Sequence, residues 1–363
     1  MSPRYFALAL LSGVACIATA WHIVPRFPKA SSTSDARVAL GRMLFFDSAL
    51  SADGKTSCAS CHQPRHAYSD GRATAVGAFG RQGTRNTPSL LTTGNNRPLF
   101  WDGRRHLLSE AVLDPLLHPA ELALANEEEI LSHIQTPAYR AAFAAAFGTT
   151  DRAPPTIDRV GLALVDFIQS LPRPITAFDR YQATHDDHTL SPESLDGLRL
   201  FIGKAGCSQC HKLDGTPSGF SDDSYHSTGT GLQSVASEIP SLSQRISAEP
   251  TDITAIGKEV GTHANVAALG RFVVTHRPRD IGLFRTPSLR YVANTPPYMH
   301  DGTVSTLEAA VDQEIYWRGL ASGQPLSLTV PERAHLIVFL YALSAKTDQP
   351  TEQRSANTRS TSQ

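Results

Sequence analysis

The chain has 363 residues, of which 41% are hydrophobic and 18% charged, and its formal net charge is −1. This length suits two domains of ordinary size, and this composition is typical of a folded globular protein. A nearly neutral chain without a basic arm argues against a nucleic-acid-binding protein.

The amino terminus has the pattern of a secretory signal peptide. Arg4 precedes an apolar run over residues 5–20 that ends in Ala18-Thr19-Ala20, and a small-residue exit of this kind is typical of signal cleavage. At about 16 residues, the run is short for a membrane span. We therefore predict a signal peptide over residues 1–20, a periplasmic protein and no stable membrane insertion after cleavage. An uncleaved anchor is the alternative.

Helix signals dominate the rest of the chain. Residues 21–34, rich in Pro and Ser, are expected to form a disordered linker, and residues 346–363, polar and without apolar periodicity, a disordered tail. Alternating strand patterns are scarce, so we predict a mainly α fold with long loops. Helices are predicted to begin at or next to Ser34 or Asp35, Asn126, Thr136, Thr156, Ser191 and Pro331.

Two short runs carry the most specific chemistry, Cys58-Ala-Ser-Cys61-His62 and Cys207-Ser-Gln-Cys210-His211. Cys-x-x-Cys-His is the signature of c-type haem attachment, in which both thiols bind one porphyrin and the histidine ligates its iron. A thioredoxin-like redox pair does not need the histidine, and a zinc site built from both pairs would leave both histidines unexplained. The sequence therefore predicts two covalently bound c-type haems.

An internal repeat predicts two fused cytochrome c-type haem domains. The run Thr87-Pro-Ser-Leu90 recurs as Thr286-Pro-Ser-Leu289, and the agreement continues without a gap through Asp102-Gly103 and Asp301-Gly302. The step from the haem histidine to this run is about 50 residues longer in the second copy, which indicates an insertion rich in Gly, Ser and Thr. We expect domains over residues 35–185 and 190–345.

Four further motifs carry a family resemblance: Leu40-Gly-Arg-Met-Leu-Phe-Phe-Asp47, Phe100-Trp-Asp-Gly-Arg104, Pro297-Tyr-Met-His-Asp-Gly302 and Tyr316-Trp-Arg-Gly319. Together with both haem motifs, they resemble the bacterial di-haem cytochrome c peroxidase/MauG superfamily over nearly all of residues 35–345. The resemblance implies that hydrogen peroxide reacts at the amino-terminal haem, while the carboxy-terminal haem stores or delivers electrons.

The resemblance also assigns the distal side of the first haem. Glu121 matches the acid–base residue of the family, and splitting an O–O bond requires a proton to move from one oxygen to the other. The alternative is a helix-start glutamate that acts as a cap. Ala78 follows Val76-Gly77, where many members carry a removable distal histidine, so the first iron is expected to be five-coordinate. Ala111 stands where the family has a glutamine.

For the second haem, the resemblance implies Tyr316 as the sixth iron ligand, and Met299 is the second choice. A phenolate donates strongly and lowers the potential of the iron. The alternative is that Tyr316 is a plain core tyrosine. Trp101 matches the family tryptophan between the haems, an oxidisable residue that would divide one long electron transfer into two, although core packing would also explain it.

A possible calcium site completes the assignment. Asn86, Thr295 and Pro297 match the inter-domain calcium ligands of the family, and their oxygens suit a hard cation.

The predicted function is therefore that of a di-haem peroxidase that takes electrons from a periplasmic cytochrome c or a cupredoxin. One alternative is a MauG-like oxidase that modifies residues of a partner protein, which Ala78 and Tyr316 favour. A second alternative is a non-enzymatic di-haem electron carrier, in which both irons would be six-coordinate.

Overall fold

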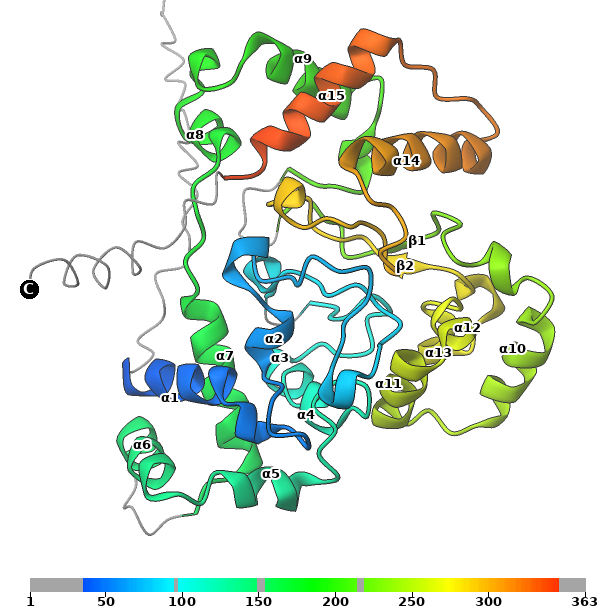
Figure 1. Cartoon of the computed structure of the whole chain (residues 1–363). Helices are drawn as coiled ribbons and strands as arrows, with labels where there is room; N and C mark the ends of the chain where they lie inside the picture. The colour runs from blue at the N-terminus through cyan, green and yellow to red at the C-terminus, as the bar shows by residue number, and fades with distance from the viewer. Residues whose placement is uncertain (1–34, 95–96, 149–153, 214–218, 346–363) are drawn as a thin grey trace, which may run out of the picture.

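The computed structural model describes residues 35–94, 97–148, 154–213 and 219–345, and it is mainly helical (Figure 1). The predicted signal peptide, the linker over residues 21–34 and the tail over residues 346–363 lie outside the described residues. Within these four ranges, no helix combines the length and the apolar character that crossing a membrane requires.

The described helices fall into an amino-terminal and a carboxy-terminal series. The first series is α1 (Asp35–Phe46), α2 (Cys58–Cys61), α3 (Leu108–Ala111), α4 (Asp114–Leu117), α5 (Glu127–His133), α6 (Pro137–Phe147) and α7 (Ile157–Ser170). The second is α8 (Ala177–Thr184), α9 (Pro192–Ile202), α10 (Ile239–Ala248), α11 (Ile253–Thr262), α12 (Ala264–Ala267), α13 (Phe272–Thr275), α14 (Leu307–Ser322) and α15 (Val330–Ala342). Strands β1 (Tyr225–His226) and β2 (Phe284–Arg285) pair antiparallel, and Tyr225 is opposite Arg285.

The predicted helix starts are confirmed, and two of them show why. Asn126 caps α5, because its side chain accepts a hydrogen bond from the backbone N–H of Glu129. Thr136 caps α6 in the same way, and Gly148 ends that helix with a φ of 62°, a left-handed conformation that glycine adopts without strain.

The first module is built on the crossing of α1 and α7. A Cβ atom on Gly41 of α1 would lie only 1.9 Å from the carbonyl oxygen of Ala163 on α7. The close approach brings Phe45 and Phe167 together, with ring centroids 5.0 Å apart. Gly41 is therefore the residue that lets these two helices touch.

The second module repeats this crossing with α9 and α15. A Cβ atom on Gly197 would lie 2.0 Å from the carbonyl oxygen of His335. Phe201 and Phe339 then pack with ring centroids 5.2 Å apart, four residues after Gly197 and His335 respectively. The repeat read from the sequence is thus also a repeat of packing, and the two-module fold is confirmed.

Along the chain, membership changes from the first core to the second between Leu171 and Phe178. The first core ends, along this part of the chain, at Leu171. Phe178 of α8 already belongs to the second core, where it packs on Phe220 and Phe339.

The long insertion of the second module is a helical subdomain and not only a Gly-, Ser- and Thr-rich loop. Helices α10 to α13 form their own small core around Leu242, Val260 and Phe272. They lie together at the side of the molecule, next to the amino-terminal module (Figure 1).

We predict that Gly197→Ala lowers the midpoint of thermal unfolding of the haem-loaded protein. The added methyl group would push α9 away from α15, at a cost of about 1–3 kcal/mol. Circular dichroism at 222 nm measures the change.

Gly319→Ala on α14 is the matched control, because its Cβ would meet the nearest atom at an ordinary 3.4 Å. An unchanged midpoint for Gly197→Ala would contradict the close crossing.

Candidate functional site

The histidine of each haem motif is held in the same way. His62 Nδ1 lies 2.8 Å from the carbonyl oxygen of Tyr68, and His211 Nδ1 lies 2.9 Å from that of Phe220. A carbonyl oxygen can only accept, so each Nδ1 carries the hydrogen, and each Nε2 keeps its lone pair for a metal. Burial lowers the pKa of both histidines, which favours the neutral imidazole that iron requires.

The repeated Thr-Pro-Ser-Leu run has a structural role beside these histidines. Ser89 Oγ donates to the carbonyl oxygen of Ala67, at 2.5 Å, and Ser288 Oγ donates to that of Gly219, also at 2.5 Å. In each module, the next residue supplies the carbonyl that binds the histidine. The serine therefore fixes the loop that orients the iron ligand, a contact that the repeat alone did not reveal.

The four cysteines fit covalent haem attachment. Cys58 and Cys61 are the first and last residues of the short helix α2, which directly precedes His62. Burial raises the pKa of both thiols to about 12 and that of Cys207 to about 11, so they are protonated thiols and not metal-binding thiolates at neutral pH. Two thiols that can add to the vinyl groups of a porphyrin, beside an imidazole whose Nε2 is available to iron, are the groups that c-type haem attachment requires.

Glu121 lies near the two cysteines of the first haem motif. Its negative charge raises the pKa of both Cys58 and Cys61, in addition to the larger effect of burial. The backbone N–H of Ala78 donates to the carbonyl oxygen of Glu121 at 2.6 Å, and Val76 offers its carbonyl to Cys61 Sγ at 4.0 Å. The segment that lacks the distal histidine, the acid–base candidate and the attachment cysteines are therefore neighbours.

Ala78 and Ala111 are both buried. Ala78 has no exposed surface, and Ala111 packs in the core of the first module. A methyl group at each position cannot bind iron or donate a hydrogen bond, so Glu121 is the ionisable side chain that these three positions offer.

Asp53 also binds the segment that contains Ala78, through the backbone of Phe79. Its Oδ2 accepts the backbone N–H of Phe79 at 2.9 Å, while its Oδ1 accepts the N–H groups of Lys55 and Thr56. The hydrogen bond from Phe79, with the others, holds the pKa of Asp53 well below its usual range. Sequence reasoning missed this residue, because its partner lies 26 positions away.

Trp101 lies where the two modules meet. Its Nε1–H donates to the carbonyl oxygen of Asn86 at 2.9 Å, and its ring lies 6.5 Å from that of His300. The backbone N–H of Asn86 donates to the carbonyl oxygen of His300 at 2.8 Å. Asn86 of the first module and His300 of the second are therefore in direct contact.

The two candidates for the sixth ligand of the second iron remain predictions. Tyr316 stands on α14, two residues from both Glu314 and Arg318, whose charges act on Cys207 and Cys210. Positions two residues apart on an α-helix differ by a rotation of about 200°. Tyr316 therefore lies on the face of α14 opposite to Glu314 and Arg318, and it is 62% exposed. Met299 is half-buried directly before His300 and has a φ of 70°.

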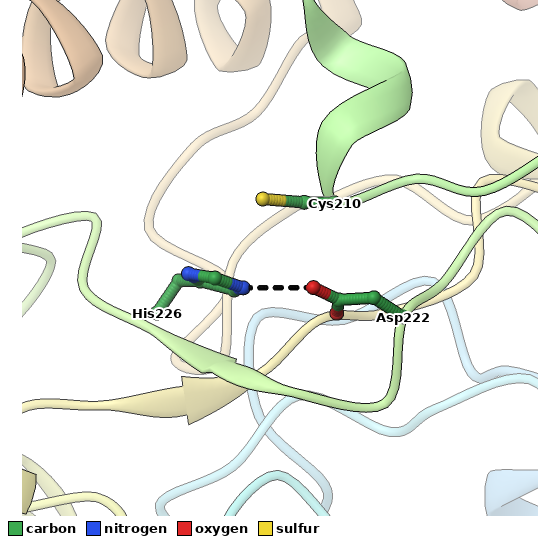
Figure 2. Close-up of side chains that lie close together, drawn as sticks. All are labelled: Cys210, Asp222 and His226. Atoms are coloured by element: carbon green, nitrogen blue, oxygen red, sulfur yellow. Dashed lines mark hydrogen bonds and ion pairs between the residues drawn. The ribbon is translucent and has the colours of Figure 1, made fainter.

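Figure 2 shows a further group of side chains, Cys210, Asp222 and His226, whose ligand atoms lie within 4.8 Å of one another. His226 Nε2 faces Asp222 Oδ2 at 3.0 Å. A cysteine joined to a haem vinyl group no longer offers a thiolate to a metal. This group is therefore assigned to the edge of the second haem site and not to a separate metal site.

We predict that Asp53→Asn destabilises the protein at pH 7, because the amide would turn a donor toward a backbone N–H. A carboxylate whose native pKa is lowered contributes stability above its unfolded pKa of about 4 and loses it as the pH falls further. The difference from the wild type should therefore shrink below about pH 4. Urea unfolding at stepped pH values measures this difference.

Asp186→Asn is the matched control, because Asp186 caps a short 3-10 turn through a single hydrogen bond that an asparagine oxygen also accepts. A difference for Asp53→Asn that persists unchanged at pH 3 would contradict the ionised form as its source.

Comparisons with known proteins agree with this geometry. The family model described as di-haem cytochrome c peroxidase matches residues 35–187. The chain is 31% identical over 324 residues to methylamine utilization protein MauG of Methylorubrum extorquens, which covers 88% of this chain and 81% of that protein. It is 35% identical over 287 residues to cytochrome c551 peroxidase of Nitrosomonas europaea, with 78% and 74% covered.

A solved structure is also similar. A MauG-like protein associated with microbial copper homeostasis superposes with a TM-score of 0.67 at 30% identity, over 86% of this chain and 91% of that chain. Two haem modules, each with an oriented histidine, and relatives of this similarity lead to one conclusion. The chain belongs to the di-haem cytochrome c peroxidase/MauG family, and it is an oxidoreductase of the peroxidase type with two c-type haems.

Proposed function

We propose that this protein is a periplasmic peroxidase that reduces hydrogen peroxide at the His62 haem. Electrons would reach this site through the His211 haem from a protein donor. The observation that supports the proposal is that Glu121 lies near Cys58 and Cys61 and binds the backbone of Ala78, the residue that the family resemblance assigns to the position of a removable ligand. The signal-peptide pattern of residues 1–20 supports the periplasmic location.

The chemistry requires a proton carrier and two electrons. When bound, the haems would pass on two electrons from the protein donor, and peroxide, two protons and two electrons give two water molecules. Glu121 would take the proton of one peroxide oxygen on its carboxylate and deliver it to the other, which leaves as water. Its backbone is held by Ala78 and its side chain is partly exposed, so the carboxylate can exchange its proton with solvent.

Trp101 would connect the two sites. Its indole is anchored by the hydrogen bond to Asn86 and lies against His300, so it contacts both modules. An oxidisable ring at this contact between the modules would divide one long electron transfer into two shorter ones. We also propose a calcium ion bound by Asn86, Thr295 and Pro297, which would make the contact between the two modules more rigid.

A MauG-like oxidase that modifies a partner protein is the second candidate. Ala78 supports it, because a first site without a removable ligand needs no reductive activation. The relative from Methylorubrum extorquens is itself named MauG. The third candidate, a di-haem electron carrier, would need a sixth ligand at the first iron, and Ala78 cannot provide one.

We predict that Glu121→Gln lowers the second-order rate constant for the reaction of the haem-loaded protein with peroxide. General acid–base catalysis of this kind is worth on the order of 10²- to 10⁴-fold, and an amide cannot carry the proton. Stopped-flow absorption spectroscopy measures the rate. Glu110→Gln, an exposed glutamate on α3, is the control, and equal rates for both variants would overturn the role of Glu121.

The same preparation separates the three candidates. Rapid peroxide-dependent oxidation of a reduced c-type cytochrome supports the scavenging peroxidase. Reaction with peroxide but slow oxidation of cytochrome supports the oxidase. No reaction with peroxide, and two low-spin ferric haems in the resting spectrum, would leave only the electron carrier.

We propose, from the family motif Tyr316-Trp-Arg-Gly319 alone, that Tyr316 is the sixth ligand of the second iron, and we predict that Tyr316→Phe changes the low-spin ferric signal of that haem. Removing the phenol oxygen leaves no donor at that position, while Met299→Leu should leave the signal unchanged. Electron paramagnetic resonance of the ferric protein distinguishes the two variants. The opposite result would assign the ligand to Met299.

A further inference from the structure

The turn that carries Glu121 is held between the two modules. We define the Glu121 turn as residues 118–123. On one side lies the Gly77–Ala78 segment, and a Cβ atom on Gly77 would come within 2.4 Å of the carbonyl oxygen of Glu121. Arg81 Nη1 donates to the carbonyl oxygen of Pro119 at 3.0 Å. This side of the turn belongs to the first module.

His118 is the centre of the turn. Its carbonyl oxygen accepts the backbone N–H groups of Glu121 at 2.9 Å and of Ala123 at 3.0 Å. Its ring atom Nδ1 accepts the N–H of Ala120 at 3.1 Å. Three amides of the Glu121 turn therefore depend on one residue, which is only 5% exposed.

The ring of His118 rests on α11 of the inserted subdomain. His118 Nε2 lies 3.2 Å from the carbonyl oxygen of Gly257, which can only accept, so Nε2 carries the hydrogen and Nδ1 is free to accept from Ala120. A Cβ atom on Gly261, one turn further along α11, would lie 2.0 Å from His118 Nε2. Only a residue without a side chain lets the ring lie against the helix there.

Two more contacts tie α11 to the first module around this ring. Thr84 Oγ1 donates to the carbonyl oxygen of Val260 at 2.5 Å. Arg105 Nη2 donates to Thr254 Oγ1 at 3.3 Å and forms a paired ion contact with Asp114, at the start of α4. The helix is thus docked at several points, and His118 is its contact with the Glu121 turn.

We propose that His118 is a positioning residue for Glu121 and that α11 is the support through which it acts. The second module would then complete the peroxide side of the first haem site, besides supplying electrons to it. This inference rests on the proposed function of Glu121.

The action runs through the backbone and not through a direct bond. His118 Nδ1 lies 3.7 Å from Glu121 Oε1, which is too far for a hydrogen bond, and it already accepts from Ala120. The ring fixes where the turn lies, and the turn fixes where the carboxylate lies. A displacement of about 1 Å in such a group is enough to slow a reaction markedly.

Gly261→Ala tests the proposal from the second module, far along the chain from Glu121. The methyl group must displace the His118 ring, so we expect the rate constant with peroxide to fall about tenfold to hundredfold. Thr262→Ala, the exposed neighbour on the same helix, is the matched control. Haem content and the ferric absorption spectrum of each variant establish that both haems are attached.

A readout independent of activity accompanies the rates. Hydrogen exchange of the Ala120, Glu121 and Ala123 amides should be faster in Gly261→Ala than in Thr262→Ala.

His118→Asn and His118→Gln form a second pair of variants, in case Gly261→Ala folds poorly. The asparagine oxygen can replace Nδ1 toward Ala120 but cannot reach Gly257, whereas the glutamine amide can replace Nε2 toward Gly257. Support from α11 therefore predicts that His118→Gln retains more of the rate than His118→Asn.

Combination with Glu121→Gln separates the inference from the proposed function. If His118 acts through Glu121, Gly261→Ala causes no further loss in the Glu121→Gln background. If Glu121→Gln reacts slowly with peroxide but Gly261→Ala has the wild-type rate and wild-type amide exchange, the inference is overturned and the proposed function stands. A further loss of tenfold or more in the double variant also overturns it, and a normal rate for Glu121→Gln overturns the proposed function itself.

Discussion

Each half of this protein depends on the hydrogen bond between the Nδ1–H of its haem-motif histidine and a backbone carbonyl. The bond selects the tautomer, aims Nε2 and increases the basicity of the ring toward a metal. A serine of the repeated Thr-Pro-Ser-Leu run then holds the loop that supplies the carbonyl. The same chain of contacts, from serine to loop to histidine, occurs in both modules, which explains why this run is among the best-preserved parts of the repeat.

The two modules share this core and differ in what surrounds it. In the first, the buried Ala78 and the carboxylate of Glu121 lie near the motif cysteines. In the second, the long insertion forms helices α10 to α13, which lie against the first module (Figure 1). A duplicated fold has thus become asymmetric, because the insertion of the second copy contacts the Glu121 turn of the first.

Local and covalent features were predictable from the sequence. Haem attachment needs two thiols and an imidazole at fixed spacing, so a short motif is sufficient to recognise it. Helix caps such as Asn126 and Thr136 act within three residues, and both appear as expected. The crossings at Gly41 and Gly197 were visible only as matching letters in two copies, and their meaning came from the distances.

Features that depend on distant partners were decided by the tertiary structure. Phe178 of α8 joins the second core because its ring meets Phe220 and Phe339, which lie far along the chain. His118 had no assignable role in the sequence, yet its ring joins the Glu121 turn to Gly257, more than a hundred residues away. The sequence by itself determined which groups bind haem, because that chemistry is local. Only the folded chain decided which residues surround those groups, because packing and hydrogen bonding act through space and not along the backbone.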